Sequence, residues 1–269
     1  MTPKTDIVLF TDSTPNGQKV SVVLEELGLK YEMKHVDISK GTQKEGWFLK
    51  INPNGRIPAI VDRTPKADGK EQEKRVFEGG AILLYLCQKY DPAGKLSYPY
   101  DSDEHWEIVE WIMWMQSGLG PMQGQSNHFY RYAPEKIEYG INRYKTETKR
   151  LYSVIEARLV QQKISQKASS SPWIVGDKIT IADLACFSWV NWAEWAGIYL
   201  QREDGTNFLE LKDWLERINS REAVKRGLDV PKPFTLKEKW QTKEGEEEYA
   251  KHHSNWIMEG QKENHETHK

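Results

Sequence analysis

The sequence predicts an α/β domain followed by an all-α domain, and three observations carry this prediction. Its 269 residues are enough for two domains of ~100–200 residues each. Strand and helix patterns alternate over residues 1–92, whereas only helical patterns follow. Between the two, residues 91–102 are rich in Pro, Ser and Asp, as a linker is. We therefore expect domains at 1–92 and 103–235 and a charged tail at 236–269.

The chain opens with a predicted strand, helix and strand. Ile7 to Phe10 form a short continuous apolar run, which is typical of a strand buried on both faces. Apolar residues then recur at helical spacing from Val20 to Leu27, and Gly28 stands where a helix would end. The imperfect alternation from Tyr31 to Val36 suits a second strand. Strand, helix and strand in this order predict a parallel pair.

A helix, a hairpin and another helix complete this domain. The first helix is expected from Lys44 to Ile51, because Asn52 to Gly55 all favour turns. Ala59 to Val61 and Arg75 to Phe77 are strand candidates joined by a long polar loop. Ala81 to Tyr90 then carry apolar residues along one side of a helix.

Helical patterns continue in the second domain. Asp101 and Glu104 have the spacing of a capping box, and a break is expected at Gly118 to Pro121. Pro134 can open a long helix at its first turn. The expected inner stripe of that helix is Ile137, Ile141, Tyr144, Leu151, Ile155 and Leu159.

A clearer start signal occurs at Thr180. The Thr180 hydroxyl and the Asp183 carboxylate can each accept from an unpaired amide, which is a capping box. Ile179 and Leu184 can form a hydrophobic staple around it. A buried helix containing Cys186 should follow.

Composition limits the partners and the compartment. Lys and Arg total 38 against 40 Asp and Glu, and a net charge of −2 argues against a nucleic-acid or anionic-membrane partner. The longest apolar stretch, Ala81 to Cys87, is too short to span a membrane, and the first residues lack a signal-peptide pattern. We therefore expect a cytoplasmic protein. Cys87 and Cys186 are isolated among apolar neighbours, so both should be buried thiols.

The tail is polar but contains aromatic anchors. Trp240, Tyr249 and Trp256 can dock it on the body of the protein. His252 and His253 lack a carboxylate or cysteine at a known ligand spacing, so we assign no metal site.

Three segments, in this order, carry a family resemblance: Thr14-Pro15-Asn16-Gly17, Arg56-Ile57-Pro58-Ala59-Ile60 and Glu78-Gly79-Gly80-Ala81-Ile82. With the order of the elements, they resemble a glutathione transferase over residues 5–235. The resemblance implies a thioredoxin-like N-terminal domain that binds glutathione and an all-helical C-terminal domain. Lys40 to Gln43 and Ile141 to Tyr144 are similar to the nu class and to the fungal nitrogen-regulator branch.

The second and third segments are expected to bind the glutathione backbone. Ile57-Pro58 enters a strand at a turn and is a candidate cis peptide. The resemblance implies that the Ile57 backbone pairs with the cysteine of glutathione like an added strand. It also implies that the amides at Glu78 and Gly79 bind the γ-glutamyl carboxylate, which a helix N-terminus favours. The family usually has a Ser at the position of Gly79, so one hydrogen bond is missing or replaced. Glu78 can accept from the γ-glutamyl ammonium or merely stabilise the first turn.

The thiol of glutathione needs a hydrogen-bond donor, because a thiol pKa near ~8.5 leaves it mostly protonated at neutral pH. No Tyr or Cys lies between Thr11 and Gly17, which leaves Ser13, Thr14 and Asn16. The resemblance implies that Thr14 and Asn16 are the catalytic donors. Asn16 could instead cap the helix.

Two further residues are expected to contact glutathione. The resemblance implies that Gln43 contacts its glycyl end and that Arg143 holds a carboxylate, which suits a guanidinium fork. Arg143 could equally pair with Glu147 on the helix surface. The tryptophan groups at 106–114 and 189–195 are expected in the core or an interface, or as walls of a second pocket.

The resemblance thus implies a glutathione-dependent homodimeric enzyme that presents a thiolate to an electrophile, a hydroperoxide or a disulfide. The nu-like motifs favour disulfide reduction. Because neither cysteine is placed for exchange, glutathione would supply every reacting sulfur. The alternative is a regulatory or assembly protein that keeps the fold but performs no chemistry.

Overall fold

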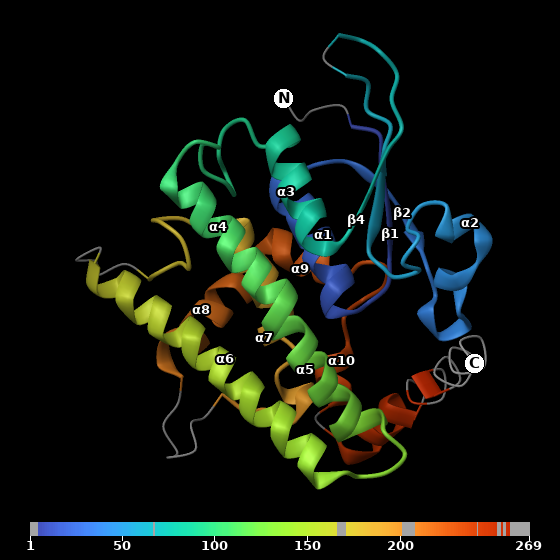
Figure 1. Cartoon of the computed structure of the whole chain (residues 1–269), viewed down its shortest axis with the longest axis vertical. Coiled ribbons are helices and arrows are strands. Elements are labelled where there is room, and N and C mark those ends of the chain that lie inside the picture. Colours follow the sequence, from blue (N-terminus) through green and yellow to red (C-terminus); the bar gives the residue numbers. More distant parts are fainter. Residues whose placement is uncertain are drawn as a thin grey trace.

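The computed structural model describes residues 5–66, 68–165, 171–200, 208–240, 242–251, 254, 257 and 258. A four-stranded sheet with helices forms the first part of the chain, and helices form the second (Figure 1). In chain order, the first part contains β1 (Ile7–Thr11), α1 (Pro15–Leu27), β2 (Tyr31–His35), α2 (Gly46–Leu49), β3 (Ala59–Asp62), β4 (Lys74–Phe77) and α3 (Gly79–Tyr90). The second contains α4 (Asp103–Trp114), α5 (Gly120–Asn127), α6 (Glu138–Ser165), α7 (Ile181–Val190), α8 (Leu209–Asn219), α9 (Glu222–Leu228) and α10 (Leu236–Lys239).

The sheet has the strand order β2-β1-β3-β4. β2 is parallel to β1, as predicted, whereas β3 is antiparallel to both β1 and β4. Ile7 and Leu9 of β1 lie in the larger core with α1 and α3, and Val8 and Phe10 pack with Phe48 of α2 on the other face. This burial on both faces explains the continuous apolar run in β1. In Figure 1, α2 accordingly lies on the opposite side of the strands from α1 and α3.

The start and the end of α4 differ from the prediction. Ser102, not Asp101, is the N-cap, since its hydroxyl accepts from the His105 amide at 3.2 Å. The expected break at Gly118 to Pro121 is also wrong. A π-helical turn, Met115–Leu119, links α4 to α5, and the proline lies in the first turn of α5, where its missing N–H is tolerated.

The long helix α6 does not begin at Pro134 as predicted. The preceding chain is still in a helical turn, because the Ala133 amide donates to the His128 carbonyl. The helix starts only at Glu138, and Ile137 of the predicted inner stripe lies outside it with 43% of its surface exposed. The other aliphatic members of the stripe are buried: Ile141, Leu151, Ile155 and Leu159.

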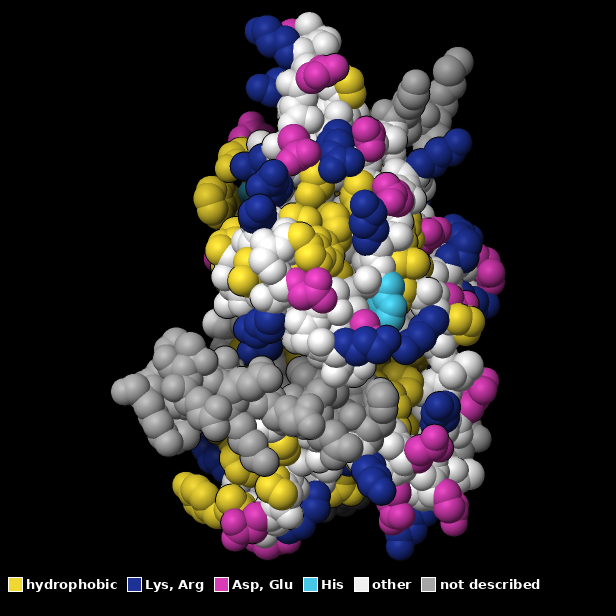
Figure 2. Space-filling view, turned by 90° about the vertical axis from the view of Figure 1, so that its right-hand side faces the viewer, with side chains coloured by type: hydrophobic (Ala, Val, Ile, Leu, Met, Phe, Trp, Pro, Cys, Tyr) yellow, Lys and Arg dark blue, Asp and Glu magenta, His cyan; other side chains and the backbone are white. Residues whose placement is uncertain are grey.

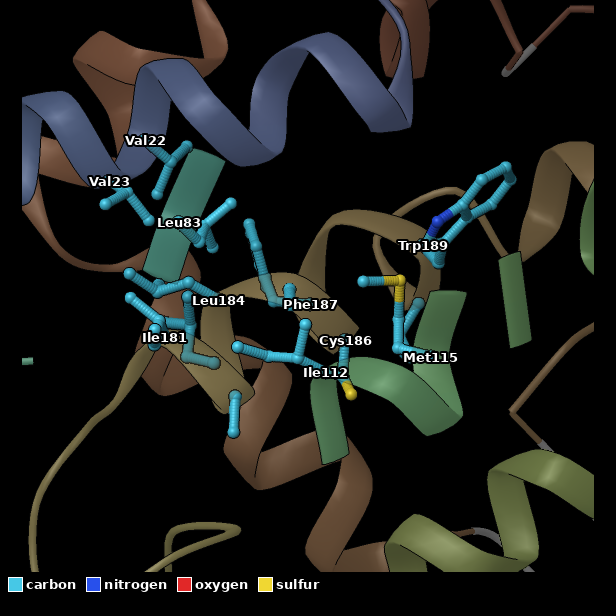
Figure 3. Packing of buried hydrophobic residues seen from close by; sticks show 14 of the residues in the cluster. Val22, Val23, Leu83, Ile112, Met115, Ile181, Leu184, Cys186, Phe187 and Trp189 are labelled. Carbon is cyan, nitrogen blue, oxygen red and sulfur yellow. The ribbon is translucent and has the colours of Figure 1, made fainter. Parts of the chain in front are cut away.

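The capping box at the start of α7 is confirmed. Thr180 Oγ1 accepts from the Ala182 amide, and Asp183 Oδ2 accepts from the Thr180 amide at 2.9 Å. Both residues of the predicted staple, Ile179 and Leu184, are buried. Figure 3 shows α7 side chains packed with residues of α1, α3 and α4, so the two parts share one core.

Both cysteines are free and buried, as predicted. Burial raises the pKa of the Cys87 thiol and of the Cys186 thiol far above the ordinary value. Neither side chain is therefore available as a thiolate.

Hydrogen bonds join α1 of the first part to α9 of the second. Ser21 Oγ donates to the Gly227 carbonyl at 2.6 Å, and Gln18 Nε2 donates to the Leu228 carbonyl at 3.2 Å. The two helices approach so closely that a Cβ at Gly227 would lie 2.5 Å from Val22 Cα. This joint fixes the position of α1 against the helical part.

The described part of the tail packs on the helical part, as predicted for Trp240 and Tyr249. The Trp240 ring stacks on Trp195 at a centroid distance of 5.3 Å, and the Tyr249 ring meets Trp195 edge-on at 4.9 Å. Arg131 holds both carboxylate oxygens of Glu246, at 3.0 and 2.9 Å. Three tail residues considered above lie outside the described residues: His252, His253 and Trp256.

The surface agrees with the near-neutral net charge. On the face seen in Figure 2, acidic and basic side chains are interspersed rather than gathered in one field. Among the described helices, none combines the length and the apolar character needed to cross a bilayer.

Candidate functional site

An open cleft of about 550 Å³ is lined by residues of both parts of the chain. Its walls come from the start of α1, the loop before β3, the start of α3, the π-helical turn after α4, α5 and the end of α7. The lining residues discussed below are Asn16, Ile57, Glu78, Gly79, Gln116 and Trp189. The first four of these were expected to bind or activate a ligand. The fold thus brings together four predicted site residues that are distant in the sequence.

The first helix begins at the cleft and is capped by Thr14. The Thr14 hydroxyl oxygen accepts from the Gly17 amide at 3.1 Å, and the hydroxyl hydrogen remains available for donation. Asn16 therefore does not cap the helix, and its side chain faces the cleft. Thr14 and Ser13 line an adjoining cleft. Ser13 Oγ is buried and has no hydrogen-bond partner among the described residues.

Asp12 holds the turn between β1 and α1. Its Oδ1 accepts from the Ser13 amide at 2.7 Å and lies 3.1 Å from His35 Nε2, while its Oδ2 accepts from the Ile38 amide at 3.2 Å. Asp12, His35 and Asp37 bring possible metal-ligand atoms within 4.8 Å of one another. Since the Asp12 oxygens already accept backbone hydrogen bonds, we assign the cluster to holding this turn. No ligand spacing in the sequence indicated this cluster.

Ile57 lies in the loop before β3. The Ile57-Pro58 bond is cis, as predicted. Asn52 stabilises this loop, because its Nδ2 donates to the Arg56 carbonyl at 2.7 Å and its Oδ1 accepts from the Asn54 amide at 2.9 Å. Within the described ranges, neither the N–H nor the carbonyl of Ile57 has a protein partner. This backbone edge can pair with an extended peptide.

Glu78 and Gly79 form the start of α3. Glu78 has a φ of 71° and makes no side-chain capping bond, so the first amides of α3 have no side-chain acceptor from this residue. A carboxylate is suited to such a helix N-terminus. Glu78 Oε2 accepts instead from Gln116 Nε2 at 3.1 Å, and this bond links α3 to the turn after α4.

The space beside Gly79 is occupied by Lys19, a residue that the sequence analysis did not single out. A Cβ at Gly79 would lie 3.0 Å from Lys19 Cδ and 3.4 Å from Lys19 Nζ. Lys19 is completely buried, and burial lowers the pKa of its ammonium to about 7, a shift that the nearby titratable groups Cys186 and Glu78 oppose. The only feature of the sequence that could have placed Lys19 near the site was its position, one helical turn after Asn16 on the same side of α1.

Three predicted site residues do not line this cleft: Thr14, which lines the adjoining one, Gln43 and Arg143. Gln43 is buried outside it, with Nε2 3.4 Å from the Ile38 carbonyl and Oε1 unpartnered among the described residues. Arg143 is exposed on α6, where Nη1 lies 3.9 Å from Glu147 Oε2, the surface pair considered as its alternative. Their expected contacts with glutathione remain predictions.

One tryptophan of the two predicted groups lines the cleft. Trp189 is 7% exposed, and its Nε1 is buried without a partner among the described residues. A Cβ at Gly120 would lie 3.0 Å from this nitrogen. Trp192 and Trp195 belong to the core that receives the tail. Trp189 thus adds an indole N–H and an aromatic surface close to the cleft.

Comparison with known proteins identifies the family. Two family models match the chain, the N-terminal domain of glutathione S-transferase at residues 7–88 and its C-terminal domain at residues 112–222. The chain belongs to the glutathione S-transferase family. The fold expected from the resemblance, a thioredoxin-like domain followed by an all-helical domain, is therefore confirmed.

The relatives include a disulfide-bond oxidoreductase and proteins crystallised with glutathione. The chain is 43% identical to the disulfide-bond oxidoreductase YfcG of Escherichia coli over 223 residues, which cover 82% of this chain and 94% of the relative. A crystallised glutathione transferase homologue of Lodderomyces elongisporus, with two glutathione molecules per subunit, is 40% identical with a TM-score of 0.76, over 84% of this chain and 99% of that one. Ure2p in complex with glutathione is 34% identical with a TM-score of 0.74, over 85% and 96% of the two chains.

Proposed function

We propose that this member of the glutathione S-transferase family binds glutathione in the cleft and uses its thiolate to reduce disulfides, with electrophiles and hydroperoxides as other acceptors. One observation carries the proposal. The donor Asn16, the unpaired backbone of Ile57 and the N-terminus of α3 at Gly79 line the same cleft. Each matches one part of the tripeptide. Glutathione-bound relatives at 34–40% identity and disulfide-bond oxidoreductases at 37–43% identity support the proposal.

The groups of the cleft suggest how glutathione lies in it. Its γ-glutamyl carboxylate receives hydrogen bonds from the first amides of α3, while Glu78 accepts from its ammonium. Its cysteinyl N–H and carbonyl pair with the backbone of Ile57. The thiol then lies near the start of α1, where Asn16 of this cleft provides an amide N–H and Thr14, which lines the adjoining cleft, provides a hydroxyl. Such donors favour the thiolate over the thiol and so lower the thiol pKa.

The reaction requires two glutathione molecules and no protein thiol. A glutathione thiolate attacks the substrate disulfide, forms a mixed disulfide and releases one substrate sulfur as thiolate. A second thiolate attacks the glutathione sulfur of the mixed disulfide, which gives oxidised glutathione and releases the other substrate sulfur. Two electrons pass from the two glutathione molecules to the substrate. Buried Cys87 and Cys186, whose thiol pKa values are raised, take no part.

Calorimetry and turnover with the purified protein test this proposal. We expect glutathione to bind, and glutathione to reduce cystine catalytically with formation of oxidised glutathione. Binding without turnover of cystine, an aryl halide or a hydroperoxide would favour the alternative, a regulatory or assembly protein with this fold. Absence of binding would reject the proposed enzymatic function. A homodimer in the cytoplasm is part of the proposal and is checked by light scattering and cell fractionation.

The substitution Gly79→Ser is expected to tighten glutathione binding. The serine Cβ would lie 3.0 Å from Lys19 Cδ, so this part of the buried side chain must shift by a few tenths of an ångström while Nζ keeps its hydrogen bonds. The new hydroxyl then donates to the γ-glutamyl carboxylate, and such a bond is worth enough to lower the dissociation constant about tenfold. Calorimetry measures the change. Gly79→Ala is the matched control, because it adds the Cβ without the hydroxyl, and an equal gain in that variant would contradict the explanation.

A further inference from the structure

A row of hydrogen-bonded side chains has buried Lys19 at its centre, and its other members Asn16, Gln116 and Glu78 line the cleft. Lys19 Nζ lies 3.1 Å from Asn16 Oδ1, 2.9 Å from Gln116 Oε1 and 3.5 Å from Met115 Sδ. Gln116 Nε2 in turn donates to Glu78 Oε2 at 3.1 Å. The row therefore connects the start of α1 with the start of α3 through the turn after α4.

The hydrogen-bonding capacity of an ammonium determines the orientation of the Asn16 and Gln116 side-chain amides. A lysine ammonium has three N–H donors and no acceptor, and three acceptor atoms surround Nζ. Asn16 and Gln116 must therefore both direct their oxygens toward Lys19 and their NH2 groups away from it. For Gln116 this places Nε2 on Glu78. For Asn16 it leaves Nδ2, which has no protein partner in the described part of the chain, for the cleft.

We propose that Lys19 is a positioning residue, whose ammonium turns the Asn16 side chain so that its NH2 group, and not its oxygen, faces the sulfur of glutathione. The opposite orientation would direct a carbonyl oxygen at the sulfur and would repel a thiolate. Lys19 itself is completely buried and acts on the thiolate through Asn16. The inference rests on the proposed binding of glutathione.

Hydrogen bonds stabilise the Lys19 ammonium at its buried position, where burial lowers its pKa to about 7. The titratable groups that act on Nζ are Glu78 at the start of α3 and Cys186 of α7, whose buried thiol stays protonated near neutral pH. Lys19 otherwise lies among neutral groups from α1, the turn after α4 and the start of α3. A buried ammonium costs free energy unless its hydrogen bonds are satisfied. Its hydrogen bonds to two amide oxygens provide this compensation and connect the charge to the donor Asn16.

The test is the pKa of the glutathione thiol bound to the holoprotein, measured by titrating the ultraviolet absorbance of the thiolate. In the wild-type protein we expect this pKa to lie below the ordinary value of ~8.5. Lys19→Met keeps the length of the side chain but removes the donor, and we expect the thiol pKa to rise by about one unit. Asn16→Ala should raise it at least as much. In the double variant Lys19→Met/Asn16→Ala, the pKa should equal that of Asn16→Ala alone.

The double variant separates positioning from a direct effect of charge. If the two shifts add, Lys19 acts on the sulfur without Asn16, and the inference is overturned. It is also overturned if Lys19→Met leaves the thiol pKa unchanged. The matched control is Lys237→Met, because Lys237 Nζ likewise donates to an asparagine oxygen, Asn191 Oδ1 at 2.6 Å, outside the cleft. The pKa of the glutathione thiol bound to Lys237→Met should equal the pKa measured with the wild-type protein.

A measurement on the wild-type protein covers the case that Lys19→Met does not fold. In the glutathione complex, nuclear Overhauser contacts should join the Asn16 NH2 protons to the cysteinyl methylene of glutathione. Contacts from these protons to the Lys19 side-chain end instead would overturn the inference and leave the proposed function intact. Failure of the wild-type protein to bind glutathione would remove the proposed function and this inference together.

Discussion

Replacing Asp183 by alanine is expected to lower the free energy of unfolding by about 3–5 kcal/mol. Asp183 is completely buried at the start of α7. Its Oδ1 accepts from the Ile174 amide and from Trp214 Nε1, both at 2.9 Å, and its Oδ2 accepts from the amide and the hydroxyl of Thr180. The substitution removes the acceptor of all these donors and leaves them buried. Denaturant unfolding followed by tryptophan fluorescence measures the loss.

Asp213→Ala is the matched control for this prediction. Asp213 also carries a carboxylate that accepts from an arginine, Arg217, but 52% of its side chain is exposed. An exposed ion pair contributes about 0–1 kcal/mol, so the control should unfold nearly as the wild-type protein does. Similar losses in Asp183→Ala and Asp213→Ala would show that burial of the carboxylate is not what makes Asp183 important.

The double substitution Thr14→Ala/Asn16→Ala is expected to lower turnover with cystine roughly tenfold to a hundredfold. Hydrogen bonds to a charged group contribute about 1.5–3 kcal/mol, and each ~1.4 kcal/mol corresponds to a tenfold change in rate. The loss should be largest near neutral pH and smaller at alkaline pH, where the thiol ionises without help. Steady-state rates at several pH values and saturating glutathione measure it.

Thr14 also caps α1, so the loss of a cap needs its own control. Ser102→Ala removes an equivalent cap, the hydroxyl that accepts from the His105 amide at the start of α4. Ser102 does not line the cleft, and we expect the control to lose stability of about 0.5–2 kcal/mol without a change in turnover. Unchanged turnover in Thr14→Ala/Asn16→Ala would exclude these residues as the donors. Loss of turnover on Ser13→Ala alone would then point to the unpartnered hydroxyl of Ser13.

Local signals in the sequence predicted the elements of the fold where one local rule decides the structure. Gly28 ends α1 with a φ of 68°, and the Thr180 capping box starts α7, because each depends on a few neighbouring residues. The predicted starts of α4 and α6 were wrong because neighbouring residues there allow more than one start. Adjacent Asp101 and Ser102 are both suitable caps, and Pro134 is tolerated both before and inside a first turn.

For the site, too, the sequence predicted what neighbouring residues determine and missed what distant residues determine. The segments at Thr14, Ile57 and Glu78 each show their local geometry in the sequence, and the structure brings Asn16, Ile57, Glu78 and Gly79 to one cleft. Lys19 was missed, since nothing in a helical pattern distinguishes a buried lysine from an exposed one. Its burial depends on Met115 and Gln116, almost a hundred residues further along the chain.

The joint between α1 and α9 makes the two parts of the chain thermodynamically dependent on each other. Besides the Ser21 and Gln18 bonds, buried Glu26 at the end of α1 accepts from Arg221 at 2.6 and 2.8 Å. The first helix, which carries Asn16 and Lys19, is therefore stabilised by residues beyond 200 as well as by its own sheet. The chain should denature in a single cooperative transition, and a fragment ending in the linker at 91–102 would lose the support that holds its catalytic helix in place.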